Sequence, residues 1–167
     1  MLPRLTVLTA LVAAACAATP APPAASSHPA SVTPTPSSGY DAELARRLGA
    51  DEYGMHSYVL ALLKPGPNRT QSPEQAKQLM QAHLANIMRL AEAGSLVVAG
   101  PFLDDGPISG IYIFKVATVE EARALTATDP AIQAGRLEME LHPWYGSAAL
   151  QEVNTLHKRL QKKSILD

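Results

Sequence analysis

Residues 95–116, SLVVAGPFLDDGPISGIYIFKV, carry the pattern that decides the fold. Ser95–Phe102 and Ile108–Val116 are apolar segments of strand length, and Asp104, Asp105 and Gly106 lie between them. Asp and Gly favour the backbone conformations that tight turns need. The stretch therefore predicts an antiparallel hairpin with a slightly long turn.

Upstream of this hairpin, the sequence predicts a strand followed by a long helix. Ser57–Leu63 is a short apolar run that ends at a Pro- and Gly-rich turn, which is typical of a buried strand. Ser72 can cap a helix that has Pro73 in its first turn and Gln75 at the third position, and Gly94 can end it. Between them apolar residues recur at helical spacing: Ala76, Leu79, Met80, Leu84, Ile87, Met88 and Ala91.

Downstream, the pattern predicts a second helix and a fourth strand. Thr118 can cap a helix over 119–127, and Asp129 begins a helical turn that reaches Gly135. Apolar and polar residues then alternate from Leu137 to His142, as in a half-buried strand. The order is β-α-β-β-α-β, so we expect an α+β domain of the ferredoxin-like, split βαβ type.

Additional elements flank this core, which we place at residues 40–149. Asp41 can cap a short helix over 42–48. Residues 150–167 have helical apolar spacing and predict an amphipathic C-terminal helix that lies on the domain or its partner. Two helices cover only one face of a four-stranded sheet. Pairing of two sheets would cover the other face, so we expect a homodimer.

The first sixteen residues have the layout of a secretion signal. Arg4 precedes an almost continuous apolar run over 5–15, which is too short to span a bilayer comfortably. The alanines before Cys16 resemble a lipobox, which would make Cys16 a lipidated first residue. Two alternatives remain: cleavage by an ordinary signal peptidase near Ala17 or Ala18, or a Cys16 without any role.

Residues 17–39 are rich in Pro, Ala, Ser and Thr and almost free of charge. Such a composition buries too little apolar surface to fold, and it predicts a disordered linker. The order of signal, linker and domain favours a lipoprotein of the cell envelope that faces the periplasm. We expect contact with the membrane through the lipid anchor only, and otherwise secretion to the periplasm.

Composition excludes several classes of function. The formal net charge is −1, and the only basic run is 157–163, so we expect no nucleic-acid partner. A single cysteine excludes an internal disulfide framework and a multi-thiolate metal site. The sequence has no phosphate-binding Gly-rich loop and no serine elbow, and it predicts no cofactor.

Four short motifs in order, together with two flanking segments, resemble the YCII (YciI-like) family. The motifs are Tyr58-Val59-Leu60, His83-Leu84, Ala99-Gly100-Pro101 and Asp129-Pro130, and the flanking segments are 48–55 and 142–146. The resemblance covers roughly residues 40–149. It implies a dimeric ferredoxin-like α/β barrel whose pocket contains a His and an Asp, here His83 and Asp129.

The residues themselves give this pair two interpretations. His83 lies within the apolar stripe of its helix, where an imidazole can exchange protons if a carboxylate orients it. It can equally be a buried histidine bonded to a backbone carbonyl. Asp129 precedes Pro130 and can simply cap a helix, although capping and a site role are compatible.

Other candidates are weaker. Gly100 is a position where a ligand or another backbone can approach closely, and Pro101 limits strand pairing beside it, so we expect both at the pocket. His142 shares a strand face with Glu138 and Glu140, but alternating charges usually face water, and we expect no metal.

These observations favour a small envelope enzyme that performs His/Asp acid–base chemistry on a small cyclic organic molecule, of lyase, dehydrohalogenase or isomerase type. Two alternatives stay open: a binding or sensory module that uses the same pocket without turnover, and a dimeric assembly protein.

Overall fold

The computed structural model describes residues 39–166. The expected signal, Cys16 and almost all of the linker lie outside these residues. In the described part, the elements are α1 (Ala42–Arg47), β1 (Met55–Pro65), α2 (Pro73–Glu92), β2 (Leu96–Pro101), β3 (Gly110–Phe114), α3 (Val119–Thr126), α4 (Pro130–Gln133), β4 (Leu137–Ser147), the 3-10 helix η1 (Ala148–Glu152) and α5 (Val153–Leu160). No helix in 39–166 is long and apolar enough to cross a membrane.

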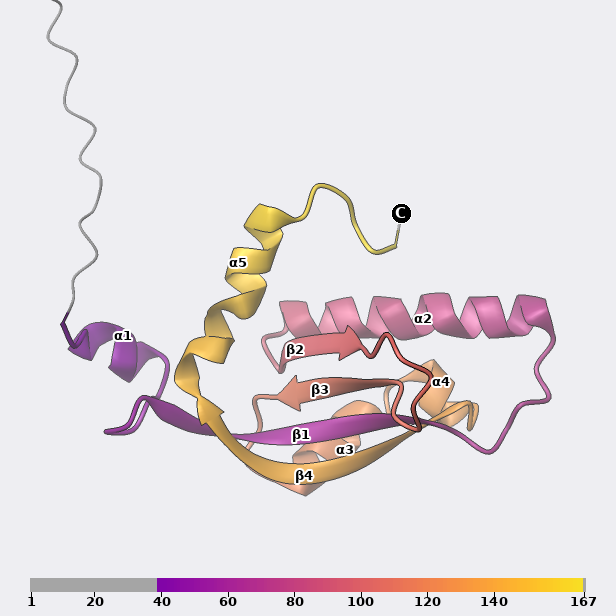
Figure 1. Cartoon of the computed structure of the whole chain (residues 1–167), viewed down its shortest axis with the longest axis horizontal. Helices are drawn as coiled ribbons and strands as arrows, with labels where there is room; N and C mark the ends of the chain where they lie inside the picture. Colours follow the sequence, from indigo (N-terminus) through magenta and orange to yellow (C-terminus); the bar gives the residue numbers. More distant parts are fainter. Residues whose placement is uncertain (1–38, 167) are drawn as a thin grey trace, which may run out of the picture. The chain divides into compact units, whose positions relative to one another are not determined.

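The four strands form one antiparallel sheet in the order β2-β3-β1-β4 (Figure 1). β3 separates β1 from β2, and β1 separates β3 from β4, so each crossover helix joins strands that are not neighbours. This is the split βαβ arrangement of the ferredoxin-like fold. The predicted fold class is confirmed.

The caps form as the sequence predicts. Ser72 and Gln75 make a reciprocal capping box at the start of α2, and Thr118 and Glu121 make another at the start of α3. Each box satisfies backbone N–H groups that have no partner inside the helix. α2 is consequently fixed at its first turn and runs along the sheet for 20 residues.

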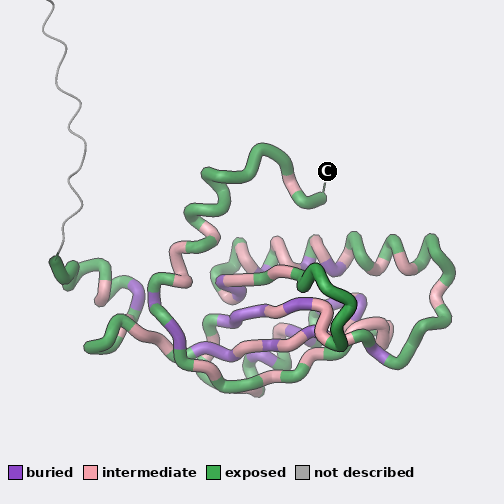
Figure 2. Tube along the Cα trace, in the orientation of Figure 1, coloured by how far each residue is buried: buried purple, intermediate pink, exposed green. Residues whose placement is uncertain are grey.

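The two faces of the sheet have separate apolar clusters. The helix-facing cluster joins the strands to α2 and α3 and consists of Val59, Ala61, Leu63, Leu90, Leu96, Tyr112, Phe114 and Ala122. On the opposite face, Tyr58, Val97 and Ile113 pack with Trp144 and Leu150, so η1 covers part of that face. Figure 2 shows the buried residues concentrated along the central strands.

The elements differ from the prediction mainly in length: β1 extends beyond 57–63, β3 is shorter than 108–116, and β4 and the C-terminal helix differ most. β4 continues through Pro143 to Ser147 and pairs with β1 throughout, which is possible because β4 is an edge strand and Pro has no N–H to donate. The predicted C-terminal helix over 150–167 was too long: α5 ends at Leu160. The apolar stripe stops there, since Lys163 and Ser164 occupy the next two positions on that face.

Candidate functional site

The structure brings His83 and Asp129 into direct contact. Nδ1 of His83 lies 2.6 Å from Oδ2 of Asp129, although 46 residues separate them in the sequence. The His83 side chain is 7% exposed and that of Asp129 is fully buried. A hydrogen bond this short between buried groups orients the imidazole and assigns the Nδ1 proton to the side of the carboxylate.

Asp129 also caps a helix, so the structure contains both the predicted cap and the contact with His83. Its Oδ1 accepts a 2.8 Å hydrogen bond from the backbone N–H of Ala131, at the start of α4. Each carboxylate oxygen therefore has its own partner. The cap fixes the plane of the carboxylate, and the other oxygen points at the imidazole.

Tyr112 is the third member of the site, and the sequence analysis missed it. Its hydroxyl lies 3.2 Å from Nε2 of His83, and the two rings are stacked with centroids 6.2 Å apart. In the neutral imidazole with its proton on Nδ1, toward Asp129, Nε2 is the acceptor and the Tyr112 hydroxyl donates. Burial, and then the charge of Asp129, raise the pKa of the Tyr112 hydroxyl above its ordinary value, so it stays protonated at neutral pH.

A second polar network holds the segment that carries Asp129. Asn86 is buried one helical turn after His83, and its Oδ1 accepts from Arg89 at 2.7 Å and from Thr128 at 3.1 Å. Arg89 also donates to the Thr128 hydroxyl at 2.8 Å. Since Thr128 precedes Asp129, this network ties the carboxylate to α2.

His83 and Tyr112 line a cavity of about 270 Å³ between α2 and the end of the sheet where β1 and β2 finish and β3 and β4 begin. Gly100 and Pro101 lie in its wall, as expected, and Asp129 lies behind His83 outside it. A Cβ added to Gly100 would meet no atom within 4 Å, so packing does not require glycine there. The full lining is Leu63, Met80, His83, Leu84, Ile87, Ala99, Gly100, Pro101, Ser109, Gly110, Tyr112, Leu137 and Ile165.

The cavity is therefore apolar apart from one imidazole, one phenol and one serine. Such a pocket favours a small, largely apolar ligand that meets a few fixed polar groups. The His83 Nε2 can accept or return a proton there, and the Tyr112 hydroxyl can donate a hydrogen bond.

His142 and its neighbours lie elsewhere. His142 and Glu140 are within 2.9 Å of each other on the exposed edge strand β4, and Lys64 also donates to Glu140. In residues 39–166, no three His, Cys, Asp or Glu side chains are grouped closely enough to hold a metal ion. The edge-strand charges form a solvated cluster.

A family model, the YCII-related domain, matches residues 57–145. The chain belongs to the YCII family. The match covers α2, β2, β3, α3 and α4 in full and most of β1 and β4, and it includes His83, Asn86 and Asp129.

Comparison of the YCII domain with solved structures finds a similar chain in 5-chloro-2-hydroxyhydroquinone dehydrochlorinase from Burkholderia phenoliruptrix AC1100, in complex with 2,5-dihydroxybenzoquinone. The two share 20% identity with a TM-score of 0.40, over 52% of this chain and 92% of that chain. Comparison with curated proteins finds no match.

Proposed function

We propose that this YCII protein is a small enzyme that performs acid–base chemistry on a small cyclic organic molecule. His83 is the general acid or base, Asp129 orients it, and Tyr112 donates a hydrogen bond to the substrate or intermediate. The observation that carries the proposal is the buried 2.6 Å contact between His83 and Asp129 at the wall of an apolar cavity.

The chemistry follows from the contacts. With Nδ1–H donated to Asp129, the Nε2 lone pair faces the Tyr112 hydroxyl in the cavity wall. A substrate that displaces this contact can give a proton from an activated ring carbon or hydroxyl to Nε2. The neutral Tyr112 hydroxyl can then donate to the oxygen on which negative charge develops. Loss of a leaving group gives a lyase or dehydrohalogenase, and return of the proton to another atom gives an isomerase.

Two alternative functions make other demands on the structure: a binding module would use the same pocket, and an assembly protein would use the dimer face and the C-terminal helix. A binding or sensory module would release its ligand unchanged. An assembly protein would depend on the sheet face opposite α2, where Leu60, Leu62 and Ile111 are only partly buried. The contact between His83 and Asp129 favours the enzyme, because neither other role requires an oriented imidazole.

Proton exchange with a panel of ring compounds tests the proposal. Substituted hydroquinones, phenols and cyclic ketones are incubated with the protein in D₂O, and ring deuteration or elimination is followed by NMR. We expect exchange with the native protein and its loss in His83→Gln. Ligands that bind, stay unchanged and undergo no exchange would indicate a binding module.

The envelope location and the homodimer are part of the same proposal. Lipidation at Cys16 would tether the domain to a membrane by way of the linker over 17–39. Fractionation tests this, since Cys16→Ala should move the protein from the membrane to the soluble periplasmic fraction. Light scattering tests the homodimer, which should dissociate in Leu60→Glu if the open sheet face forms the interface.

A further inference from the structure

Helix α5 presents an apolar stripe that the domain does not cover. Val153, Leu156 and Leu160 recur at helical spacing and are 36%, 51% and 78% exposed. The helix is held instead through Asn154, the one residue of α5 that is not exposed, whose amide donates to the backbone oxygen of Leu96 at 2.8 Å. At 3.6 residues per turn, Asn154 lies on the other side of α5 from the stripe. The stripe therefore faces away from the domain.

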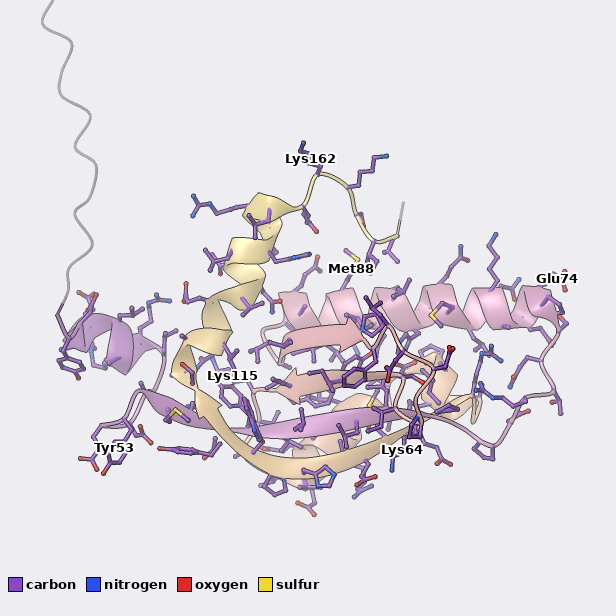
Figure 3. All side chains as sticks on the ribbon, viewed as in Figure 1. Tyr53, Lys64, Glu74, Met88, Lys115 and Lys162 are labelled. Atoms are coloured by element: carbon purple, nitrogen blue, oxygen red, sulfur yellow. The ribbon has the colours of Figure 1, made fainter. Side chains whose placement is uncertain are left out.

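Positive charge accompanies this stripe. Arg159 borders it, Lys162 and Lys163 follow it, and Figure 3 shows Lys162 pointing away from the sheet. The segment 153–166 contains no Asp or Glu, and none of these three cations forms an ion pair with a carboxylate of the described chain. Lys158 differs, since it lies on the other side of the helix in a groove that also contains carboxylates. The open side of α5 thus combines apolar side chains with unpaired positive charge.

The described chain also begins close to the base of α5. Arg47, at the end of α1, donates to Glu152 at 2.7 Å, and Gln151 donates to the backbone oxygen of Leu48 at 2.6 Å. Both partners belong to η1, which continues directly into α5. A tether that enters the domain at α1 would consequently bring the α5 end nearest to whatever surface holds it.

We propose that α5 docks on an anionic lipid surface, with its stripe in the membrane interface and Arg159, Lys162 and Lys163 against the headgroups. Charge selects this occupant. A second copy of the chain would bring the same three cations against them, and like charges oppose such pairing. The inference goes beyond the proposed enzyme, although it rests on the proposed envelope location for access to lipid. So small a surface binds weakly alone, and with a lipid anchor it supplies the second of two membrane signals.

Vesicle binding tests the role of charge. The full-length chain, with Cys16→Ala in every protein so that no lipid is attached, is sedimented with vesicles of phosphatidylcholine alone or in equal parts with phosphatidylglycerol. We expect tighter binding to the anionic vesicles, weakened about tenfold or more when Lys162→Gln and Lys163→Gln are combined. The matched control combines Lys77→Gln with Lys115→Gln, two exposed lysines outside α5, and changes the net charge equally.

A second comparison tests the role of the stripe. Leu156→Ser combined with Leu160→Ser should weaken binding to the anionic vesicles about tenfold, whereas Leu103→Ser, at a side chain that is 98% exposed outside α5, should not. All three leucines are exposed, so the thermal midpoint should stay unchanged. A polarity-sensitive fluorophore on Leu160→Cys should report apolar surroundings when anionic vesicles are added. The same label on Thr155→Cys, on the other side of α5, should not.

Several results would overturn the inference. These are equal binding to neutral and anionic vesicles, and equal losses in the α5 variants and their controls. A fluorophore response that depends on protein concentration without vesicles would assign the stripe to a second copy instead. Failure of the proposed function is a separate result, since proton exchange can be absent while binding to anionic vesicles persists. Failure of the envelope location appears only in fractionation of cells.

Discussion

The Tyr112 hydroxyl lies 3.2 Å from Nε2 of His83, on the opposite side of the imidazole from Asp129. The ring is thus held at both nitrogens. One nitrogen donates to a carboxylate that the cavity does not reach, and the other faces a hydroxyl in the cavity wall. Only the second nitrogen is placed to exchange protons with a ligand. The two contacts therefore determine which nitrogen carries the proton and which faces the cavity.

Asp129→Asn should exchange the roles of the two His83 nitrogens. The asparagine oxygen can still accept from Ala131, which places the amide N–H groups toward Nδ1 of His83. Nδ1 then becomes the acceptor, and Nε2 carries the proton. Imidazole ¹⁵N NMR should report the change of tautomer, with proton exchange reduced about 10²- to 10⁴-fold. An unchanged tautomer in the variant would show that Asp129 does not set the proton position.

Asp129→Ala should cost stability as well. The substitution removes a helix cap, worth about 1 kcal/mol, and leaves the buried His83 nitrogen without its partner, worth about 1–3 kcal/mol. The matched control is Thr118→Ala, which removes the cap of α3 away from the site and should cost about 1 kcal/mol. Urea unfolding of both variants compares the costs. Equal losses would mean that the contact with His83 adds nothing to stability.

Tyr112 should not ionise together with the exposed tyrosines. Its pKa is raised by burial and by Asp129, whereas an unfolded tyrosine ionises near pH 10. The tyrosinate absorbance gained between about pH 9 and 11 should therefore be the same in Tyr112→Phe as in the native protein. A smaller gain in the variant would show that Tyr112 is open to solvent.

The raised pKa of Tyr112 also predicts how the free energy of unfolding changes at high pH. Below pH 10 the hydroxyl is protonated in both states. As the pH rises further, the unfolded chain loses this proton and the folded chain keeps it, so unfolding becomes easier. The decline of unfolding free energy above pH 10 should be shallower in Tyr112→Phe. Chemical denaturation between pH 8 and 11 measures both slopes.

Asn86 should be needed for the position of Asp129. Asn86→Leu leaves Arg89 and Thr128 without their shared acceptor and should cost about 1–3 kcal/mol. Asn86→Asp keeps an acceptor oxygen and should retain most of the proton exchange, in contrast to Asn86→Leu. Equal exchange in the two variants would restrict Asn86 to a structural role.

The edge-strand cluster should make stability depend on pH without affecting proton exchange. Hydrogen bonds from Lys64 and then His142 lower the pKa of Glu140. A carboxylate with a lowered pKa stabilises the fold above its unfolded pKa of about 4.5, and this contribution disappears as the pH falls. Glu140→Gln should thus be less stable than the native protein at pH 7 and equal to it below about pH 3. Thermal unfolding against pH measures this difference, while proton exchange at pH 7 should be unaffected.

The order of elements could be predicted from sequence because each signal is local. The capping boxes at Ser72 and Thr118 and the hairpin turn at Asp104–Gly106 depend on neighbours in the chain, and apolar spacing assigns the faces. The extension of β4 to Ser147 depends instead on its pairing with β1, which is distant in the sequence. Local patterns do not contain that information.

The site was less predictable for the same reason. An imidazole in an apolar stripe marked His83, but Tyr112 looks like an ordinary inward residue of a strand that also buries Phe114. A signal was present, since a hydroxyl on the inward face needs a partner when buried. Ile165 carried no signal at all, because its place in the cavity depends on where α5 ends.

The two partners of the Asp129 carboxylate bear on how relatives of this chain should be compared. One oxygen serves the fold through Ala131, and the other serves the imidazole. A relative without the proposed reaction would still be selected to keep the aspartate, since the helix start depends on it. Retention of Asp129 is therefore weak evidence of catalysis in any relative, whereas a relative without the histidine should lack the proposed reaction.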